Sequence, residues 1–255
     1  MQAISPYRVV REIETLLGEF PDGVIAFDGD GTLWSGDVGE DFFFAFSDRG
    51  EYREAATERL AAEAARIGLP SEMDGAAYAR ALFRAYEKGL YPEDLTCEMI
   101  AWSPAGWAPS LLHEFVEKIL DEGKIAERAH SETRKVIDWA AKRNVPVYVV
   151  SASPRAVVEV AAARVGIDSS RVIAVTQRLE KGVLLAEVER PIPYAEGKVK
   201  QLRRRIGERP LLAAFGDNVF DVEMLGASKI PLAVRPKPRL LEVAEAVPGL
   251  RTLEV

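Results

Sequence analysis

Residues 24–33 read Val-Ile-Ala-Phe-Asp-Gly-Asp-Gly-Thr-Leu, an apolar run that ends in two aspartates separated by one glycine. Four successive apolar residues are typical of a strand that is buried on both faces of a parallel sheet. Asp28 and Asp30 follow directly, and ligands bind beyond this end of the strands in open α/β sheets. The stretch therefore predicts a buried strand with a polar site at its carboxyl end.

Three more short apolar runs have the same character, and helical patterns separate them. They are Val145–Val150, Leu211–Phe215 and Ile230–Val234. Residues 171–193 read as extended structure with a turn at 180–182. Strands that alternate with helices predict an α/β fold, a doubly wound, Rossmann-like parallel sheet. Helix starts are predicted from capping patterns at Ser71, Ser131 and Ser153.

Residues 38–125 contain no convincing strand and at least four helical segments. We therefore predict an inserted all-helical cap domain at 38–125, within a discontinuous α/β core made of 1–37 and 126–255. A cap placed directly after the first long strand is suited to cover a site at that strand's end. Trp102 and Trp107 are interpreted as cap packing, although either could hold a cationic ligand by cation–π contact.

Composition excludes several classes of protein. A net charge of −7 argues against nucleic-acid and anionic-membrane partners. Cys97 is the only cysteine, so no disulfide can form within the chain, and two histidines make a Cys/His zinc site improbable. No apolar run approaches the roughly 20 residues that span a bilayer. We predict a cytoplasmic location, whereas the oligomeric state has no signature in the sequence.

Acidic and hydroxyl side chains follow three of the predicted strands, where they would meet at one edge of the sheet. They are Asp28, Asp30, Ser151, Asp217 and Asp221. Two carboxylates within about 4 Å repel by roughly 4 kcal/mol at an effective dielectric constant near 20. A divalent cation relieves that repulsion, and ligands that are all hard oxygens favour Mg²⁺.

The same loops suit a phosphate group. Gly29 and Gly31 leave the backbone N–H groups around Asp30 open to an anion. Ser151 offers a hydroxyl and Lys198 a positive charge. Asp30 could protonate a leaving alkoxide and then activate the water that hydrolyses an aspartyl phosphate.

Rival motifs fail at specific positions. An EF-hand loop that starts at Asp28 would require glutamate where Gly39 stands. A dinucleotide-binding fingerprint would require glycine at Trp34, and a Walker A loop would require serine or threonine at Val199.

Four segments together resemble the ordered motifs of the haloacid dehalogenase superfamily. The segments are Phe27–Leu33, Val149–Ser151, Glu196–Lys198 and Gly216–Asp221. Within that superfamily they are most similar to the phosphoserine phosphatase-like branch, as is the segment Leu232–Leu240. Two positions depart from the branch: Phe220 stands where asparagine is common, with Asn218 nearby, and Asp37 stands where glutamate is common.

The resemblance implies that Asp28 is the nucleophile and Asp30 the general acid and base. It implies Mg²⁺ binding by Asp28, the backbone carbonyl of Asp30 and Asp217, with Asp221 in support. The residues that it predicts to bind phosphate or substrate are Gly29, Thr32, Asp37, Ser151, Ala152, Lys198 and Asn218.

The sequence thus predicts a phosphatase that hydrolyses a small phosphomonoester of the phosphoserine kind through a phospho-Asp28 intermediate. Its partner would be a small phosphorylated metabolite. Two alternatives stay open. One is transfer of the phosphoryl group to an alcohol other than water, and the other is a silent sensor of a phosphometabolite or metal with the same fold.

Overall fold

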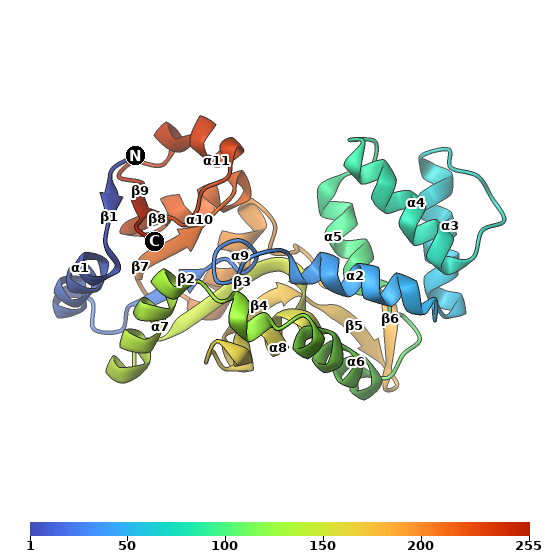
Figure 1. Ribbon diagram of the computed structural model, residues 1–255, viewed down its shortest axis with the longest axis horizontal. Coiled ribbons are helices and arrows are strands. Elements are labelled where there is room, and N and C mark those ends of the chain that lie inside the picture. Colours follow the sequence, from blue (N-terminus) through green and yellow to red (C-terminus); the bar gives the residue numbers. More distant parts are fainter.

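The structure, a computed structural model, describes residues 1–255, and a sheet of seven parallel strands forms the middle layer of its α/β part (Figure 1). The strand order is β1-β9-β8-β7-β2-β3-β4. The strands are β1 (Ala3–Ile4), β2 (Val24–Phe27), β3 (Val147–Pro154), β4 (Val172–Val175), β7 (Leu211–Gly216), β8 (Ile230–Ala233) and β9 (Arg251–Leu253). The predicted parallel α/β sheet is confirmed. The short outer strands β1 and β9 were not predicted, because two or three residues form no recognisable apolar run.

Helices cover both faces of this sheet. One face carries α1 (Pro6–Glu19), α7 (Ser131–Arg143) and α8 (Arg155–Arg164), and the other carries α9 (Glu196–Ile206), α10 (Val222–Gly226) and α11 (Pro238–Glu242). Both faces need cover because successive side chains of a strand point to opposite faces, and those of β2 are apolar on each face. Ile25 and Phe27 belong to the first apolar cluster, and Val24 and Ala26 to the second. The doubly wound arrangement is therefore confirmed.

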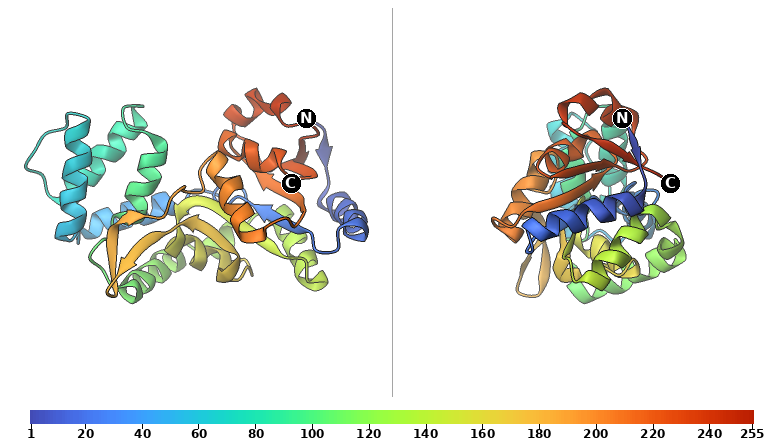
Figure 2. Two further views of the ribbon diagram at one scale, coloured as in Figure 1. Left: turned by 180° about the vertical axis from the view of Figure 1, so that it is seen from behind. Right: turned by 90° about the vertical axis from the view of Figure 1, so that its left-hand side faces the viewer.

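A region of five helices follows β2 and forms a cap-like insertion. The helices are α2 (Val38–Arg49), α3 (Glu54–Arg66), α4 (Gly75–Glu87), α5 (Glu93–Trp102) and α6 (Pro109–Glu122). Figure 2 shows α3, α4 and α5 as a lobe at the end of the molecule away from both termini. Trp102 and Trp107 are buried there, which confirms their packing role. None of the helices in the chain combines the length and apolar composition that a bilayer crossing requires.

The two connections between the helical region and the sheet run side by side. Trp34 and Ala129 form an antiparallel bridge. Next to it the His130 N–H donates to the Leu33 carbonyl over 2.9 Å. The chain thus leaves and re-enters the α/β part at one place. Division into a core of 1–37 and 126–255 and a cap of 38–125 remains a prediction.

A separate two-stranded antiparallel hairpin contacts the helical region. It consists of β5 (Gln177–Glu180) and β6 (Val183–Val188). This agrees with the prediction of extended structure over 171–193 with a turn at 180–182. Leu184 exchanges backbone hydrogen bonds with the loop that precedes α6, accepting from Gly106 over 2.8 Å and donating to Trp107 over 3.0 Å. The hairpin is therefore hydrogen-bonded to the helical region through its strand β6.

Three predicted helix caps are wrong, and the reason is clearest at Ser153. Helix α8 begins at Arg155 with Pro154 as its N-cap, and β3 continues through residue 154. The Ser153 hydroxyl is directed toward the acids instead, where it donates to Oδ2 of Asp30 over 2.7 Å. A polar partner brought in by the fold has outcompeted the local cap.

The other two caps are displaced along the chain. Ser131 is the first helical residue of α7, and His130 occupies the capping position. The capping box predicted from Ser71 is absent, because Asp74 caps α4 and accepts from the Ala77 N–H over 2.8 Å. Aspartate accepts this hydrogen bond at least as well as serine, and it lies next to the helix.

Candidate active site

Asp28 and Gly31 lie in the loop that follows β2. Asp28 is buried, and its backbone N–H donates to the Phe215 carbonyl of β7 over 2.9 Å. Gly31 adopts a φ of +82°, and a Cβ there would stand 2.2 Å from Oδ2 of Asp217. Glycine is thus required twice at this position, once by the backbone and once by the neighbouring carboxylate.

The side chain of Asp30 is held by three hydrogen bonds. Its Oδ1 accepts from the Trp34 indole N–H over 2.8 Å and from the Val38 N–H over 2.7 Å. Its Oδ2 accepts from the Ser153 hydroxyl over 2.7 Å. The loop after β2, the start of α2 and the end of β3 therefore fix this carboxylate together. Ser153 was not predicted as a site residue.

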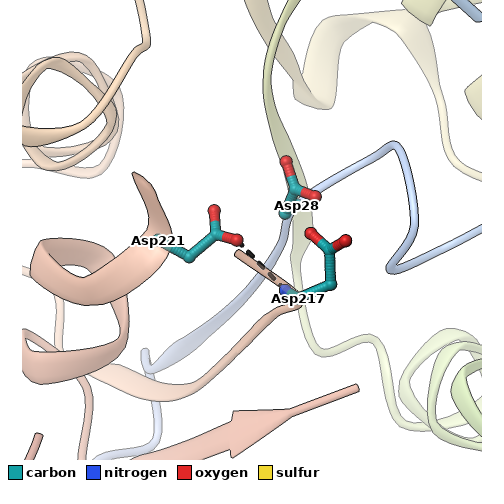
Figure 3. Close-up of side chains that lie close together, drawn as sticks. All are labelled: Asp28, Asp217 and Asp221. Carbon is teal, nitrogen blue, oxygen red and sulfur yellow. Dashed lines mark hydrogen bonds between the residues drawn. The ribbon is translucent and has the colours of Figure 1, made fainter. Parts of the chain in front are cut away.

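Asp217 and Asp221 come from the end of β7. The backbone N–H groups of Asp217 and Asn218 donate to Oδ2 of Asp221 over 3.1 and 3.0 Å, which closes a tight turn. Oxygens of Asp28, Asp217 and Asp221 all lie within 4.8 Å of one another. Figure 3 shows the three carboxylates gathered around one point. The convergence that the sequence predicted is thus present.

Lys198, in the first turn of α9, lies between two of these acids. Its ammonium group donates to Oδ1 of Asp28 over 2.6 Å and to Oδ1 of Asp221 over 2.5 Å. The neighbouring Lys200 is half exposed and pairs with Glu196 on the surface. Of the two lysines, Lys198 therefore lies in the site and Lys200 lies on the surface.

Lys237 also reaches the site, and sequence reasoning missed it. Its ammonium lies 2.9 Å from Oδ2 of Asp217, and its backbone N–H donates to the Asp217 carbonyl over 2.7 Å. The one available signal was its place in the segment 232–240 that resembles the phosphoserine phosphatase-like branch. No spacing to an acid in the sequence singles it out.

The site carries more negative than positive charge. Burial raises the pKa of Asp28 well above its ordinary value, and the nearby Asp221 carboxylate adds to the rise. Burial and Asp221 raise the pKa of Asp217 as well. Burial opposes the charge of Lys198, but Asp221 and Asp28 outweigh it and raise its pKa. Three carboxylates facing two ammonium groups leave an unbalanced negative charge.

The end of β3 forms one wall of the site. The Ser151 hydroxyl is buried and accepts from the Ser153 N–H over 3.0 Å. Ser151 and Ala152 both line the cavity at Asp28. Gly29 and Thr32 do not line it. Thr32 is fully buried, and its hydroxyl has no hydrogen-bond partner.

A cavity of about 110 Å³ lies above the acids. Asp37 lines it and also caps α2, accepting from the Glu40 N–H over 2.8 Å. Asn218 lines it while its side chain accepts from the Val219 N–H over 2.7 Å. Both residues thus have a structural task beside the predicted contact with substrate.

Phe220, which replaces the common asparagine, forms part of the cavity rim. Its ring lies 4.5 Å from that of Tyr194, centroid to centroid. The Arg239 guanidinium stands 4.9 Å from the Phe220 centroid. The substitution therefore builds an aromatic edge to the cavity in place of a polar one.

The donor set at the cavity floor fits a divalent cation. Three buried carboxylates from two strand ends converge without any histidine or cysteine in the set. Hard oxygen donors of this kind suit Mg²⁺ or a similar ion, whose charge offsets the excess of acids. A buried aspartate cluster of this composition indicates a divalent metal site.

The chain belongs to the haloacid dehalogenase-like hydrolases, because the model of that family matches residues 25–226. The match runs from β2 through α10 and so spans the acids, Lys198 and the helical insertion. The chain is therefore a hydrolase of this family. No curated protein matches the sequence.

Solved structures share the fold at low sequence identity. A protein with unknown function from Bordetella pertussis Tohama I is 22% identical with a TM-score of 0.68, over 91% of this chain and 97% of that one. A HAD family hydrolase from Salmonella enterica serovar Typhi is 15% identical with a TM-score of 0.54, over 94% and 75%. A substrate-bound phosphoserine phosphatase is 16% identical with a TM-score of 0.51, over 90% and 92%.

Proposed function

We propose that this hydrolase is a phosphatase that cleaves a small phosphomonoester through a phospho-Asp28 intermediate. The observation that carries the proposal is the meeting of Asp28, Asp217, Asp221 and Lys198 at the floor of one cavity, with Asp30 beside them. Family membership adds support, since solved phosphoserine phosphatases share the fold.

Asp28 is suited to attack phosphorus. Its Oδ1 is held by Lys198, whereas no hydrogen bond within the protein engages its Oδ2. In the first step Oδ2 forms a bond to phosphorus while the bond to the leaving alkoxide breaks. Lys198 fixes the orientation of the nucleophile and, together with Ser151, offers donors to the phosphoryl oxygens.

Asp30 is suited to move the proton. Both groups on its Oδ1 are N–H donors, so a proton on Asp30 belongs on Oδ2, the oxygen that the Ser153 hydroxyl contacts. Asp30 would protonate the leaving oxygen and then take a proton from the water that attacks the phospho-aspartate. Ser153 thus helps to fix the orientation of the carboxylate oxygen that would carry the proton.

The residues that would hold Mg²⁺ are Asp28, Asp217 and the Asp30 carbonyl, with Asp221 in support. A divalent cation there supplies positive charge to the phosphoryl oxygens. Ala152 at the end of β3 and Asn218 after β7 line the remaining wall, where they would contact phosphate or substrate.

The test compares phosphate release from a panel of small phosphomonoesters by the wild type, Asp28→Asn and Asp22→Asn with Mg²⁺ present. Asp22 is an exposed aspartate, so its variant is a matched control for the same chemical change. We expect Asp28→Asn to lose at least about a thousandfold in kcat/KM, because the nucleophile is gone, while Asp22→Asn retains full activity.

Equal rates for Asp28→Asn and the wild type would disprove the mechanism. Tight ligand capture without turnover by the wild type would favour a sensor instead. Phosphoryl transfer to an added alcohol, detected as a new phosphoester, would identify a transferase.

A further inference from the structure

The catalytic cavity continues toward the helical region into a second space. This adjoining cavity has a volume of about 70 Å³ and lies between the end of β3 and helices α2, α4 and α5. The residues that line both are Asp37, Glu93, Cys97, Ala152 and Ser153. The alcohol part of a phosphoester bound at Asp28 would therefore extend into this adjoining cavity.

Three carboxylates line the adjoining cavity, and no lysine, arginine or histidine does. Glu40 forms no ion pair or side-chain hydrogen bond in the structure. Glu93 has one distant cation, Arg239, at 3.8 Å, and Asp37 is engaged only by the Glu40 N–H. The cations that act on these acids, Lys237 on all three and Arg239 on Glu93, do not line this cavity, so no cation faces the acids within it.

The rest of the wall is aromatic and apolar. Phe83, Tyr86 and Ile100 line the adjoining cavity, and the two rings meet edge to face at 5.6 Å between centroids. Aromatic faces attract ammonium groups as well as apolar surface. Acids that simply face solvent would not need aromatic and apolar side chains around them. The combination matches a small organic cation that is partly withdrawn from water.

We propose that the substrate is the phosphoester of a small alcohol that carries an ammonium group and no carboxylate. This inference rests on the phosphatase function proposed above. The ammonium group would lie between Glu40, Glu93 and the ring of Tyr86, and the phosphoryl group would lie at Asp28.

We infer that the substrate has no carboxylate because the lysines of the site are already paired with acids of the protein. Lys198 is bonded to Asp28 and Asp221, and Lys237 to Asp217. A substrate carboxylate in the adjoining cavity would meet Glu40 and Glu93, and no guanidinium or ammonium group lines that cavity to pair with it. Like charges brought together at such a site are rejected. Phosphoserine, which has both charges, is thus disfavoured.

The experiment measures kcat/KM of the wild type with three esters that differ in one feature each. They are 2-aminoethyl phosphate, the neutral ethyl phosphate and O-phosphoserine. We expect 2-aminoethyl phosphate to be preferred over each of the others by at least about tenfold, the scale of one charge-assisted contact. Phosphocholine, tested alongside, distinguishes a primary amine from a quaternary one.

Two variants test the residues independently. Glu93→Gln and Glu40→Gln should each lower the preference for 2-aminoethyl over ethyl phosphate by about tenfold, because each removes one negative charge that faces the ammonium group. Glu208→Gln removes an exposed acid far from the cavity and should leave that ratio unchanged. Two variants on different helices keep the test valid if one of them folds poorly.

The outcomes separate this inference from the proposed function. Asp28-dependent turnover with a preference for ethyl phosphate or phosphoserine would overturn the ammonium substrate and leave the phosphatase intact. A preference ratio unmoved in both variants would also overturn it. Asp28-independent turnover, or none with any phosphoester, would instead defeat the phosphatase proposal on which it rests.

Discussion

Two buried regions of this molecule differ in their side chains, because one is charged and the other is aromatic. The floor of the catalytic cavity gathers Asp28, Asp217, Asp221 and Lys198, all charged groups that are almost fully enclosed. The interior of the helical region is a set of stacked and tilted rings around Phe46. Both sets of side chains are largely buried, yet only burial of the aromatic rings is a direct gain in free energy.

The difference separates the parts of the chain that do chemistry from those that keep it folded. Burial of charge is costly unless it is paired, whereas burial of aromatic rings is a direct stabilisation. At the cavity floor, two lysines compensate three acids incompletely. Changes at the floor should therefore affect activity and respond to pH and metal, whereas changes among the rings should affect stability alone.

The sharpest test of this contrast is Lys198→Met. Removal of the ammonium leaves Asp28 and Asp221 buried without their shared partner. Breaking a buried pair from one side costs about 3–5 kcal/mol. We expect a loss of that size in the free energy of unfolding by urea, measured in EDTA, and a fall of at least about a hundredfold in kcat/KM.

Lys200→Met is the matched control, two residues along the same helix. Lys200 pairs with Glu196 at the surface, so its loss should cost less than about 1 kcal/mol and leave turnover unchanged. Equal costs for the two variants would remove the distinction between a buried and a solvated lysine on α9.

The matching test in the aromatic interior is Phe46→Ala. The Phe46 ring contacts those of Tyr52, Trp107 and Phe115 at centroid distances of 4.9, 5.1 and 5.9 Å. Truncation of a fully buried phenylalanine costs about 3–5 kcal/mol, since it leaves a cavity. Urea unfolding should show this loss, while kcat/KM of the folded fraction changes little.

Phe44, two residues earlier on α2, provides the comparison. It is 44% exposed, so Phe44→Ala should cost less than half as much as Phe46→Ala. A larger effect of Phe44→Ala on stability would mean that this face of α2 is covered by something outside the chain.

A smaller effect is expected from pH, again at the cavity floor. The folded-state pKa of Asp28 lies above its ordinary value of 3.8, so the folded protein binds more protons than the unfolded one in the window between the two pKa values. The free energy of unfolding contributed by Asp28 therefore falls as pH rises through that window. In EDTA, the stability of Asp28→Asn relative to the wild type should rise over the same window.

Asp22→Asn, an exposed aspartate changed in the same way, should follow the wild type at every pH. Urea unfolding at several pH values measures all three proteins. A constant difference between Asp28→Asn and the wild type would mean that Asp28 titrates alike in both states.

The floor was predictable from sequence because parallel strands deliver their carboxyl ends to one edge. Asp28 and Asp217 follow apolar runs, so the pairing of β2 with β7 was enough to bring them together. The all-helical character of residues 38–125 was also predictable, because that stretch shows helical segments and no convincing strand.

Contacts made across long sequence distances escaped prediction. Ser153 was expected to cap a helix, but it bonds Asp30 more than 120 residues away. Lys237 reaches Asp217 from a loop whose course no local pattern fixes. The acids of the adjoining cavity come from two helices whose packing against β3 sets their position. Such groups carry no periodicity of their own, so only the folded chain reveals them.

The smallest effect is expected where charges lie in water. Arg80 pairs with Asp48 on the surface of the helical region, with exposed fractions of 39% and 73% for the two side chains. A solvated pair of this kind contributes less than about 1 kcal/mol. Arg80→Ala should thus shift the urea midpoint only slightly and leave kcat/KM unaltered. A marked rise in KM would instead indicate that Arg80 contacts the substrate during turnover. That result would supply the cation that the adjoining cavity lacks, and it would reopen the case for a carboxylate-bearing substrate.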